Sequence, residues 1–136
     1  MNTDIIFIDD EEDILNLIRL KFRKVFKKSN LNLNLFQTAR DFEAYIKTSE
    51  ADVLSIVSDI NMPDNNVLEL IKEYRDNFRF VLVYLCSAYD QDQFKDMIED
   101  NNVKFFFKKP LDIDNIKDRL IFDLDERGVL TSSPDL

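Results

Sequence analysis

Five short apolar runs alternate with five segments of helical periodicity, and this alternation constrains the fold more than any other feature of the chain. The apolar runs are rich in Ile, Leu, Val and Phe and cover residues 5–8, 31–36, 53–57, 80–85 and 103–107. Three of them are almost continuously apolar, which is typical of strands buried on both faces of a parallel sheet. The segments of helical spacing cover residues 10–28, 38–47, 67–77, 90–101 and 112–126. The pattern predicts a doubly wound α/β sandwich.

Helix ends are signalled mainly by Asn, Asp and Thr, because the 136 residues include a single glycine. Asn ranks next to Gly for the left-handed residue that ends a helix. Three Asn residues follow a helical segment and precede an apolar run: Asn30, Asn77 and Asn102. Three side chains are predicted N-caps: Thr38 (with Asp41 three residues on), Asp90 and Asp112.

The residue types that are missing exclude several kinds of site. The chain has no His, so it cannot build a Ser-His-Asp triad or a zinc site with imidazole ligands. Cys86 is its only cysteine, which excludes an internal disulfide and cysteine clusters, and we expect it in the core of a strand. Gly128 is its only glycine, which excludes glycine-rich phosphate loops. Any chemistry must therefore use carboxylates, hydroxyls and lysines.

The charge balance narrows the partners. With 27 acidic and 18 basic side chains, the formal net charge is −9, which disfavours nucleic acid and anionic membranes as partners. The N-terminus lacks a basic region, and its first apolar run is too short for a signal peptide or a membrane span. We therefore expect a cytoplasmic protein.

Polar side chains follow four of the five apolar runs at the point where each run ends. They are Asp9 and Asp10, Asp59 and Asn61, Ser87, and Lys109. In an open parallel sheet, functional groups gather beyond the carboxyl ends of the strands, so we expect these side chains to converge. Clustered carboxylates repel one another unless a hard cation such as Mg²⁺ lies among them. An aspartate in such a site can accept a phosphoryl group, and a hydroxyl and a lysine can stabilise the transferring oxygens.

Each of these residues also has a simpler interpretation when taken alone. The acidic run at residues 9–13 suits the first turn of a helix, where the helix dipole favours negative charge. Asp59, Ser87 and Lys109 are residue types that are common at strand ends and in loops. It is their joint occurrence at the ends of different strands that favours one functional site.

Four segments resemble the response-regulator receiver domain of bacterial two-component signalling: "IIFIDDEEDI", "VSDINMPD", "YLCSAYD" and "FFFKKPLD". As an ordered set they are highly specific, and they span about residues 4–124. The resemblance implies a flavodoxin-like sandwich with five helices and the strand order 2-1-3-4-5. It places a receiver domain at residues 1–126 and leaves residues 127–136 as a frayed tail or a linker stub.

The resemblance also implies a role for each residue of the expected site. Asp59 would be the phosphoryl acceptor, and Phe106 would occupy the aromatic switch position that turns inward on phosphorylation. The Mg²⁺ ligands would be Asp9, Asp10, Asp59 and the backbone carbonyl of Asn61. Ser87 and Lys109 would contact phosphoryl oxygens, and Pro110 would follow a cis peptide bond.

The chain departs from the family pattern in the loop after the third run and around the fifth run. Val67 stands where the family usually has Gly, so this loop must tolerate a β-branched residue. Phe106 lacks a hydroxyl and would act by packing alone, while Phe105 and Phe107 are predicted to point to the other face and into the core. Tyr89 is bulky and, with Asn61, should influence how readily water attacks an acyl phosphate.

The function implied by the resemblance is a switch controlled by phosphorylation rather than an enzyme with a separate substrate. It would catalyse only its own phosphotransfer and autodephosphorylation. The resemblance implies a histidine kinase or a histidine phosphotransfer protein as the donor, and because the chain has no His, the phosphohistidine must lie on that other protein. The output would be a protein bound by the face of the fourth helix, fifth strand and fifth helix, with the chain acting as a monomer or weak dimer.

Two other functions fit the sequence less well. A phosphohydrolase with an aspartate nucleophile usually needs a second Asp two residues on, where this chain has Asn61. A constitutive docking module that never carries phosphate typically lacks an acidic residue, the acceptor or the lysine, and here all are present.

Overall fold

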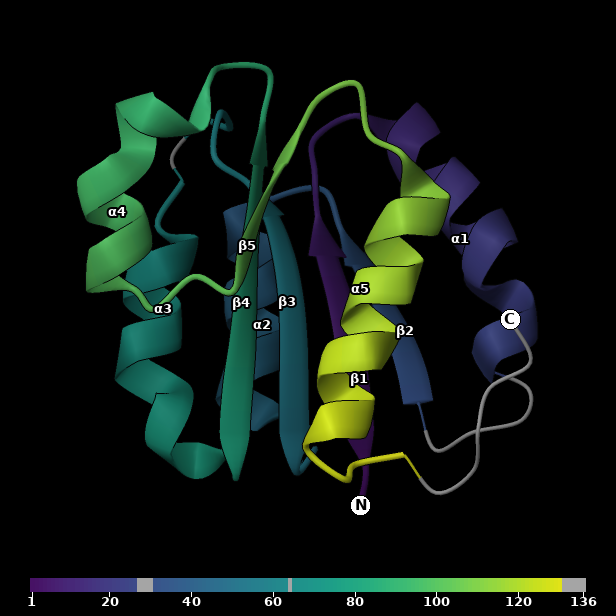
Figure 1. The fold of residues 1–136 in the computed structure, drawn as a ribbon. Coiled ribbons are helices and arrows are strands. Elements are labelled where there is room, and N and C mark those ends of the chain that lie inside the picture. The colour runs from purple at the N-terminus through teal and green to yellow at the C-terminus, as the bar shows by residue number, and fades with distance from the viewer. Residues whose placement is uncertain (27–30, 64, 131–136) are drawn as a thin grey trace.

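A five-stranded parallel sheet forms the centre of the molecule, with the strand order β2-β1-β3-β4-β5 that the resemblance implied (Figure 1). The computed structural model describes residues 1–26, 31–63 and 65–130, without the side chains of residues 24–26. The strands are β1 (Thr3–Ile8), β2 (Leu31–Phe36), β3 (Val53–Asp59), β4 (Phe80–Ser87) and β5 (Phe105–Lys108). Because β1 pairs with both β2 and β3, the order of the strands reverses beside β1. This is the place where ligands of open α/β sheets bind.

Five α-helices cover the two faces of the sheet, as the sequence predicted (Figure 1). They are α1 (Glu12–Phe26), α2 (Ala39–Thr48), α3 (Val67–Tyr74), α4 (Lys95–Asp100) and α5 (Ile113–Glu126). Helices α1 and α5 pack on one face, and α2, α3 and α4 lie on the other (Figure 1). Two short 3₁₀ helices complete the described elements: η1 (Arg75–Asn77) and η2 (Gln91–Phe94).

The core is divided into two apolar clusters by the sheet, because successive side chains of a strand point to opposite faces. In β1, Ile5 and Phe7 join the cluster beneath α1 and α5, whereas Ile6 and Ile8 join the cluster beneath α2 and α3. Every residue of β1 is buried, which accounts for the continuous apolar run at residues 5–8. Cys86 lies in the first cluster and is buried, as predicted. Burial raises the pKa of its thiol above the ordinary value.

Several of the predicted helix ends are confirmed. Asn102 has a φ of 50°, the left-handed conformation expected of it. The side chain of Thr38 accepts a hydrogen bond from Asp41 N–H at 3.0 Å, and Asp112 accepts one from Asn115 N–H at 3.1 Å. Both side chains therefore satisfy an otherwise unpaired amide in the first turn.

Of the other predicted helix ends, Asn77 is wrong, Asp90 has the predicted position but does not cap with its side chain, and Asn30 is not described. Asn77 belongs to η1 and is not left-handed, because the chain leaves α3 through a 3₁₀ turn in which Phe78 N–H donates to Arg75 O. Asp90 precedes η2 but makes no side-chain cap; its carboxylate pairs with Lys108 instead. Asn30 lies outside the described residues.

The predicted helix over residues 90–101 is interrupted. Its first part forms η2, and α4 has only six residues, none of them buried. Three apolar side chains of this segment, Phe94 of η2 and Met97 and Ile98 of α4, are half-buried against the cluster beneath α2 and α3. This helix is consequently the most weakly anchored of the five.

Packed structure continues past the end of α5, into the segment predicted to be a tail. Gly128 has a φ of 68°, and its N–H donates to Asp125 O at 3.0 Å. Val129 N–H donates to Leu124 O at 3.2 Å, which completes a Schellman motif. The Val129 side chain is only 1% exposed and lies in the core. The described part of this segment, residues 127–130, therefore closes the helix and contributes to the core.

The prediction that both neighbours of Phe106 lie in the core is only half right. Phe107 is buried, but Phe105 is 40% exposed. Strand β5 lies at the edge of the sheet. The group of α5 that contacts the Phe105 ring is a guanidinium rather than an apolar side chain. The Arg119 Cζ atom lies 4.7 Å from the centre of the Phe105 ring, a cation–π contact.

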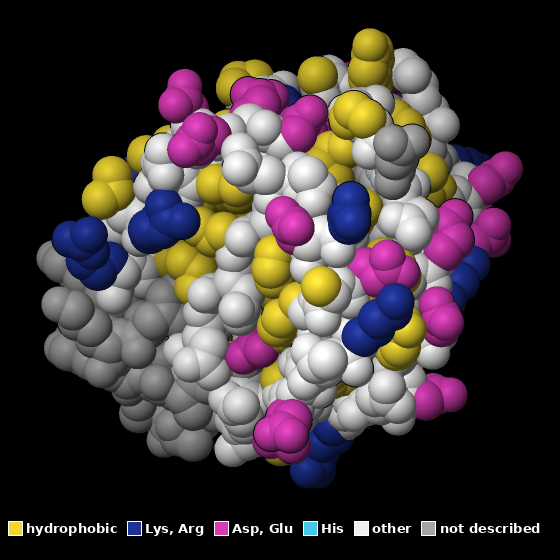
Figure 2. All heavy atoms as spheres, turned by 180° about the vertical axis from the view of Figure 1, so that it is seen from behind, with side chains coloured by type: hydrophobic (Ala, Val, Ile, Leu, Met, Phe, Trp, Pro, Cys, Tyr) yellow, Lys and Arg dark blue, Asp and Glu magenta, His cyan; other side chains and the backbone are white. Residues whose placement is uncertain are grey.

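The opposite edge of the sheet, along β2, carries a shallow groove of about 410 Å³ lined by Arg19, Arg23, Leu33 and Leu35. On this side of the molecule, apolar side chains are exposed to solvent beside basic ones (Figure 2). The long stems of arginine side chains can cover apolar surface while their charged ends stay in water. Within the described residues, the helices are too short or too polar to cross a bilayer.

Candidate functional site

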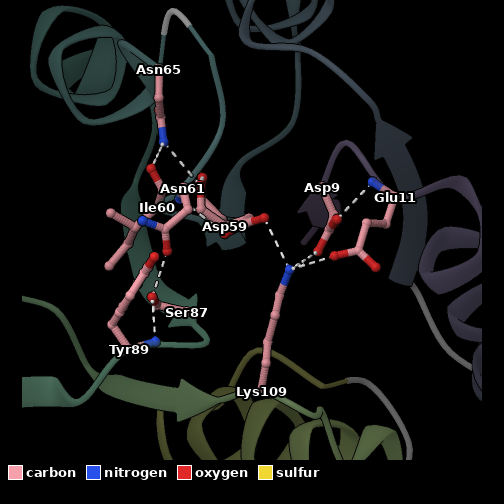
Figure 3. Close-up of polar contacts among 10 residues, drawn as sticks. Asp9, Glu11, Asp59, Ile60, Asn61, Asn65, Ser87, Tyr89 and Lys109 are labelled. Carbon is pink, nitrogen blue, oxygen red and sulfur yellow. Dashed lines mark hydrogen bonds and ion pairs between the residues drawn. The ribbon is translucent and has the colours of Figure 1, made fainter.

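The side chains that the sequence placed at strand ends come together at the carboxyl edge of the sheet (Figure 3). Asp9 follows β1, Asp59 ends β3, Ser87 ends β4, and Lys109 follows β5. Asp9 and Asp59 are each only 3% exposed, so two carboxylates are withdrawn from water at one point of the surface. Such burial is costly unless each charge finds partners.

Lys109 supplies the positive charge between these carboxylates. Its Nζ atom lies 3.0 Å from Asp59 Oδ2, 3.2 Å from Asp9 Oδ2 and 3.3 Å from Glu11 Oε1 (Figure 3). Burial alone would lower the pKa of Lys109, but the hydrogen bond to Asp59 and the attraction of Asp9 and Asp59 raise it above its ordinary value. The lysine is therefore held as a cation. The peptide bond between Lys109 and Pro110 is cis, as the resemblance implied.

The two carboxylate oxygens of Asp9 differ, because one accepts a hydrogen bond and the other does not. Its Oδ1 accepts a hydrogen bond from Glu11 N–H at 2.8 Å. Its Oδ2 is buried and makes no hydrogen bond, and its partner is the Lys109 ammonium, with which it forms an ion pair at 3.2 Å. Burial raises the pKa of Asp9, against the opposing effects of the Glu11 N–H and Lys109. An unsatisfied buried carboxylate oxygen is a position that a cation can fill.

Asp9, Asp10 and Asp59 together offer a cation three carboxylate oxygens, which lie within 4.8 Å of one another. Asp10 is exposed, whereas the other two are buried. Oxygen ligands in this number suit a hard divalent ion, which completes its shell with water or phosphate oxygens. The donor set and the unsatisfied Asp9 oxygen therefore fit a metal ion at this edge of the sheet.

Ser87 is engaged with the loop after β3 rather than with Asp59. Its hydroxyl donates to Asn61 Oδ1 at 2.5 Å and accepts a hydrogen bond from Tyr89 N–H at 3.0 Å (Figure 3). The side chain is fully buried, while Tyr89 is exposed beside it. The hydroxyl must leave Asn61 before it can donate to any other acceptor.

The loop between β3 and α3 is held by Asn65, a residue that the sequence analysis missed. Its Nδ2 donates to Asp59 O at 2.9 Å and to Ile60 O at 3.0 Å, and its Oδ1 accepts from Val67 N–H at 3.1 Å. The signal that could have found it is the residue type, because Asn in a short polar loop often bonds to nearby backbone. Glu11, the third partner of Lys109, was also missed.

Val67 occupies the position of the expected glycine without strain. It is the first residue of α3, is buried in the cluster beneath α2 and α3, and does not have a left-handed conformation. A β-branched side chain is tolerated here because the position needs no positive φ.

Phe106 lies below the polar site rather than in it. It is 8% exposed, and its ring stacks on Phe94 with centroids 5.8 Å apart. Its neighbour across the sheet is Leu85, two residues before Ser87. The ring therefore faces inward in this structure.

Comparisons with known proteins agree with this geometry. The family model of the response regulator receiver domain matches residues 5–121. A comparison with curated protein sequences found no match. Among solved structures, a CheY-like receiver domain protein from Methanospirillum hungatei is 17% identical, with a TM-score of 0.74 and coverage of 94% of this chain and 98% of that one.

Two further solved structures show the same likeness. The receiver domain of the Francisella response regulator 1452 is 25% identical, with a TM-score of 0.70 and coverage of 93% and 99% of the two chains. The chemotaxis protein CheY4 of Vibrio cholerae is 17% identical, with a TM-score of 0.70 and coverage of 88% and 97%. At these identities, the structural likeness supports the fold, and the family model supports the family.

Proposed function

The chain belongs to the receiver domain family of two-component response regulators, and on that premise we propose that it is a signalling switch activated by phosphorylation of Asp59. Receiver domains interact with histidine kinases and phosphotransfer proteins, and they typically act as switches rather than as enzymes. The proposed donor is a phosphohistidine, which must lie on such a protein because this chain contains no His.

The environment of Asp59 is the observation that carries the proposal. Its Oδ1 accepts a hydrogen bond from Asn61 N–H at 3.0 Å, and its Oδ2 lies 3.0 Å from Lys109 Nζ. The carboxylate is thus buried, oriented and charge-compensated at the mouth of the site. These are the requirements for a positioned nucleophile.

In the proposed reaction, a carboxylate oxygen of Asp59 forms a bond to phosphorus as the phosphorus–nitrogen bond of the donor breaks. The electron pair of that bond stays on the imidazole nitrogen. Lys109 stabilises charge on the phosphoryl oxygens. Asp9, Asp10, Asp59 and the backbone carbonyl of Asn61 would hold Mg²⁺, which when bound supplies further positive charge beside these oxygens.

The response begins with Ser87. On phosphorylation its hydroxyl leaves Asn61 and donates to a phosphoryl oxygen, which shifts the population toward a second packing of the loop after β4. Phe106, the aromatic switch residue, which stacks on Phe94 in this structure, follows into the space that this loop vacates. The face of α4, β5 and α5, which exposes Phe105 and Phe122, then binds a downstream protein.

The same site ends the signal. Water hydrolyses the acyl phosphate, and Asn61 and the exposed Tyr89 set how readily it reaches the phosphorus. Autodephosphorylation and phosphotransfer are the only reactions that we assign to the chain. A monomer or weak dimer and a cytoplasmic location remain predictions from the sequence.

Intact-mass measurement after incubation with Mg²⁺ and acetyl phosphate tests the proposal. We expect the mass to increase by one phosphoryl group in the wild type and in Asp76→Asn, a control at an exposed residue of η1. We expect no increase in Asp59→Asn. An unphosphorylated wild type would overturn the proposal and favour a constitutive docking module. An Asp59→Asn variant that still gains the group would overturn the assignment of Asp59 as the acceptor.

A further inference from the structure

Asn65 links the two peptide groups that follow Asp59. The amide nitrogen of its side chain donates to the carbonyls of Asp59 and Ile60, at 2.9 and 3.0 Å (Figure 3). Its oxygen accepts from Val67 N–H at 3.1 Å, which ties the same side chain to the start of α3. One carboxamide thus joins both ends of the loop between β3 and α3.

The N–H groups of these two peptides bond to β4 and to the acceptor carboxylate. In the first peptide, Ile60 N–H donates to Cys86 O of β4 at 3.0 Å. In the second, Asn61 N–H donates to Asp59 Oδ1 at 3.0 Å. Both peptides are therefore held on their carbonyl side by Asn65, and on their N–H side by β4 and by the acceptor carboxylate itself.

A peptide group is planar, so fixing its carbonyl also fixes the direction of its N–H. The bond from Asn65 to Ile60 O consequently orients Asn61 N–H toward Asp59 Oδ1. Without it, the loop has the freedom to turn this peptide, and the acceptor carboxylate loses the donor that holds one of its oxygens. The side chain of Asn66, the next residue, makes no capping hydrogen bond to α3.

From these contacts we propose that Asn65 is a positioning residue for phosphoryl transfer, which holds the Ile60–Asn61 peptide so that the acceptor Asp59 keeps its reactive orientation. The inference rests on the proposed function, since it concerns the rate at which Asp59 is phosphorylated.

Asn65→Ala and its matched control Asn66→Ala test the inference, with acetyl phosphate as donor and saturating Mg²⁺. We expect the first-order rate of Asp59 phosphorylation to fall about tenfold or more in Asn65→Ala, because small misplacements of reacting groups cost rate steeply. We expect Asn66→Ala to stay within about twofold of the wild type, since it removes none of the bonds that orient the acceptor.

Nuclear magnetic resonance supplies a readout that needs no phosphodonor. We expect the Asn61 amide proton of Asn65→Ala to move upfield and exchange faster with solvent, because its hydrogen bond to the Asp59 carboxylate is loosened. The amides of β1 and β4 should keep their wild-type shifts, which also shows that the variant is folded. Asn66→Ala should leave the Asn61 resonance in place.

Asn65→Asp separates the two halves of the contact. It keeps the acceptor for Val67 N–H and removes both donors, so the start of α3 is retained while two carbonyl oxygens face a carboxylate. We expect it to lose rate at least as much as Asn65→Ala. Full rescue by Asn65→Asp would show that Asn65 acts only through α3 and would overturn the inference.

The outcomes distinguish this inference from the proposed function. If the wild type gains no phosphoryl group, the proposed function fails, and the Asn61 resonance still reports whether Asn65 orients that peptide. If the wild type is phosphorylated but Asn65→Ala matches Asn66→Ala in rate and in the Asn61 resonance, the inference alone fails.

Discussion

The two sides of the carboxyl edge of the sheet differ in how firmly they are built. On the acceptor side, the buried carboxylates of Asp9 and Asp59 share one lysine, and the loop after β3 is held by Asn65. On the other side, Ser87 leads into η2 and α4, a six-residue helix with no buried residue. The contrast teaches that the chemistry is pre-organised while the responding surface is free to repack. Groups that must hold a transition state need rigidity, whereas elements that move are drawn from the weakly packed part of a fold.

The largest expected effect is on stability, and it compares the firmly packed helix α3 with the weakly packed helix α4. Ile71 of α3 is buried and Ile98 of α4 is half-buried, although both pack against the same cluster. Ile71→Ala should lower the free energy of unfolding by about 4 kcal/mol and Ile98→Ala by about 1 kcal/mol, because the destabilisation grows with the apolar surface that the removed atoms had buried. Urea denaturation of both variants measures the difference. Equal destabilisation would show that α4 is anchored as firmly as α3, and the two helices would no longer differ.

Hydrogen exchange measures the same contrast without a substitution. The amides of α4 should exchange through local opening, faster than those of α3 and β3, because few buried side chains oppose that opening. Exchange of α4 only at the rate of global unfolding would contradict the proposed freedom of the responding side.

The second effect removes the charge that holds the acceptor side together. Lys109→Met leaves Asp9 and Asp59 buried without their shared cation, and we expect the free energy of unfolding in EDTA to fall by about 3 kcal/mol. Added Mg²⁺ should raise the melting temperature of the variant more than that of the wild type. Lys108→Met serves as the control, because Lys108 is exposed and pairs with Asp90 at the surface. No rise in the melting temperature of either variant with Mg²⁺ would contradict the metal site.

The smallest effect concerns helix starts. Thr38 caps α2 with a hydrogen bond to Asp41 N–H, whereas Asp90 precedes η2 without one. Thr38→Ala should therefore cost about 1 kcal/mol of unfolding free energy, and Asp90→Ala about 0.5 kcal/mol or less. Thermal unfolding of the two variants decides the point. A destabilisation in Asp90→Ala that matches Thr38→Ala would mean that the start of η2 is fixed more firmly than its hydrogen bonds indicate.

Much of this molecule was predictable because burial leaves a periodic trace in the sequence. The apolar runs placed all five strands, with β3 and β4 each extending two residues further than predicted, to Asp59 and Ser87. The convergence of Asp9, Asp59 and Lys109 was also predictable, since parallel strands bring their carboxyl ends to one edge. Thr38 and Asp112 were found as caps because their partners are only three residues away.

The sequence by itself determined the layers, the edge that carries the site and the residue types available there, because these depend on the order of apolar and polar residues along the chain. Only the tertiary structure decided which of those residues touch. Asn65 reaches Asp59 O, Phe105 lies under Arg119 rather than in the core, and Val129 returns to the core after Gly128. Each of these contacts depends on the path of a loop or on the side chains of a neighbouring element. The local pattern of hydrophobicity predicts neither the path nor those side chains.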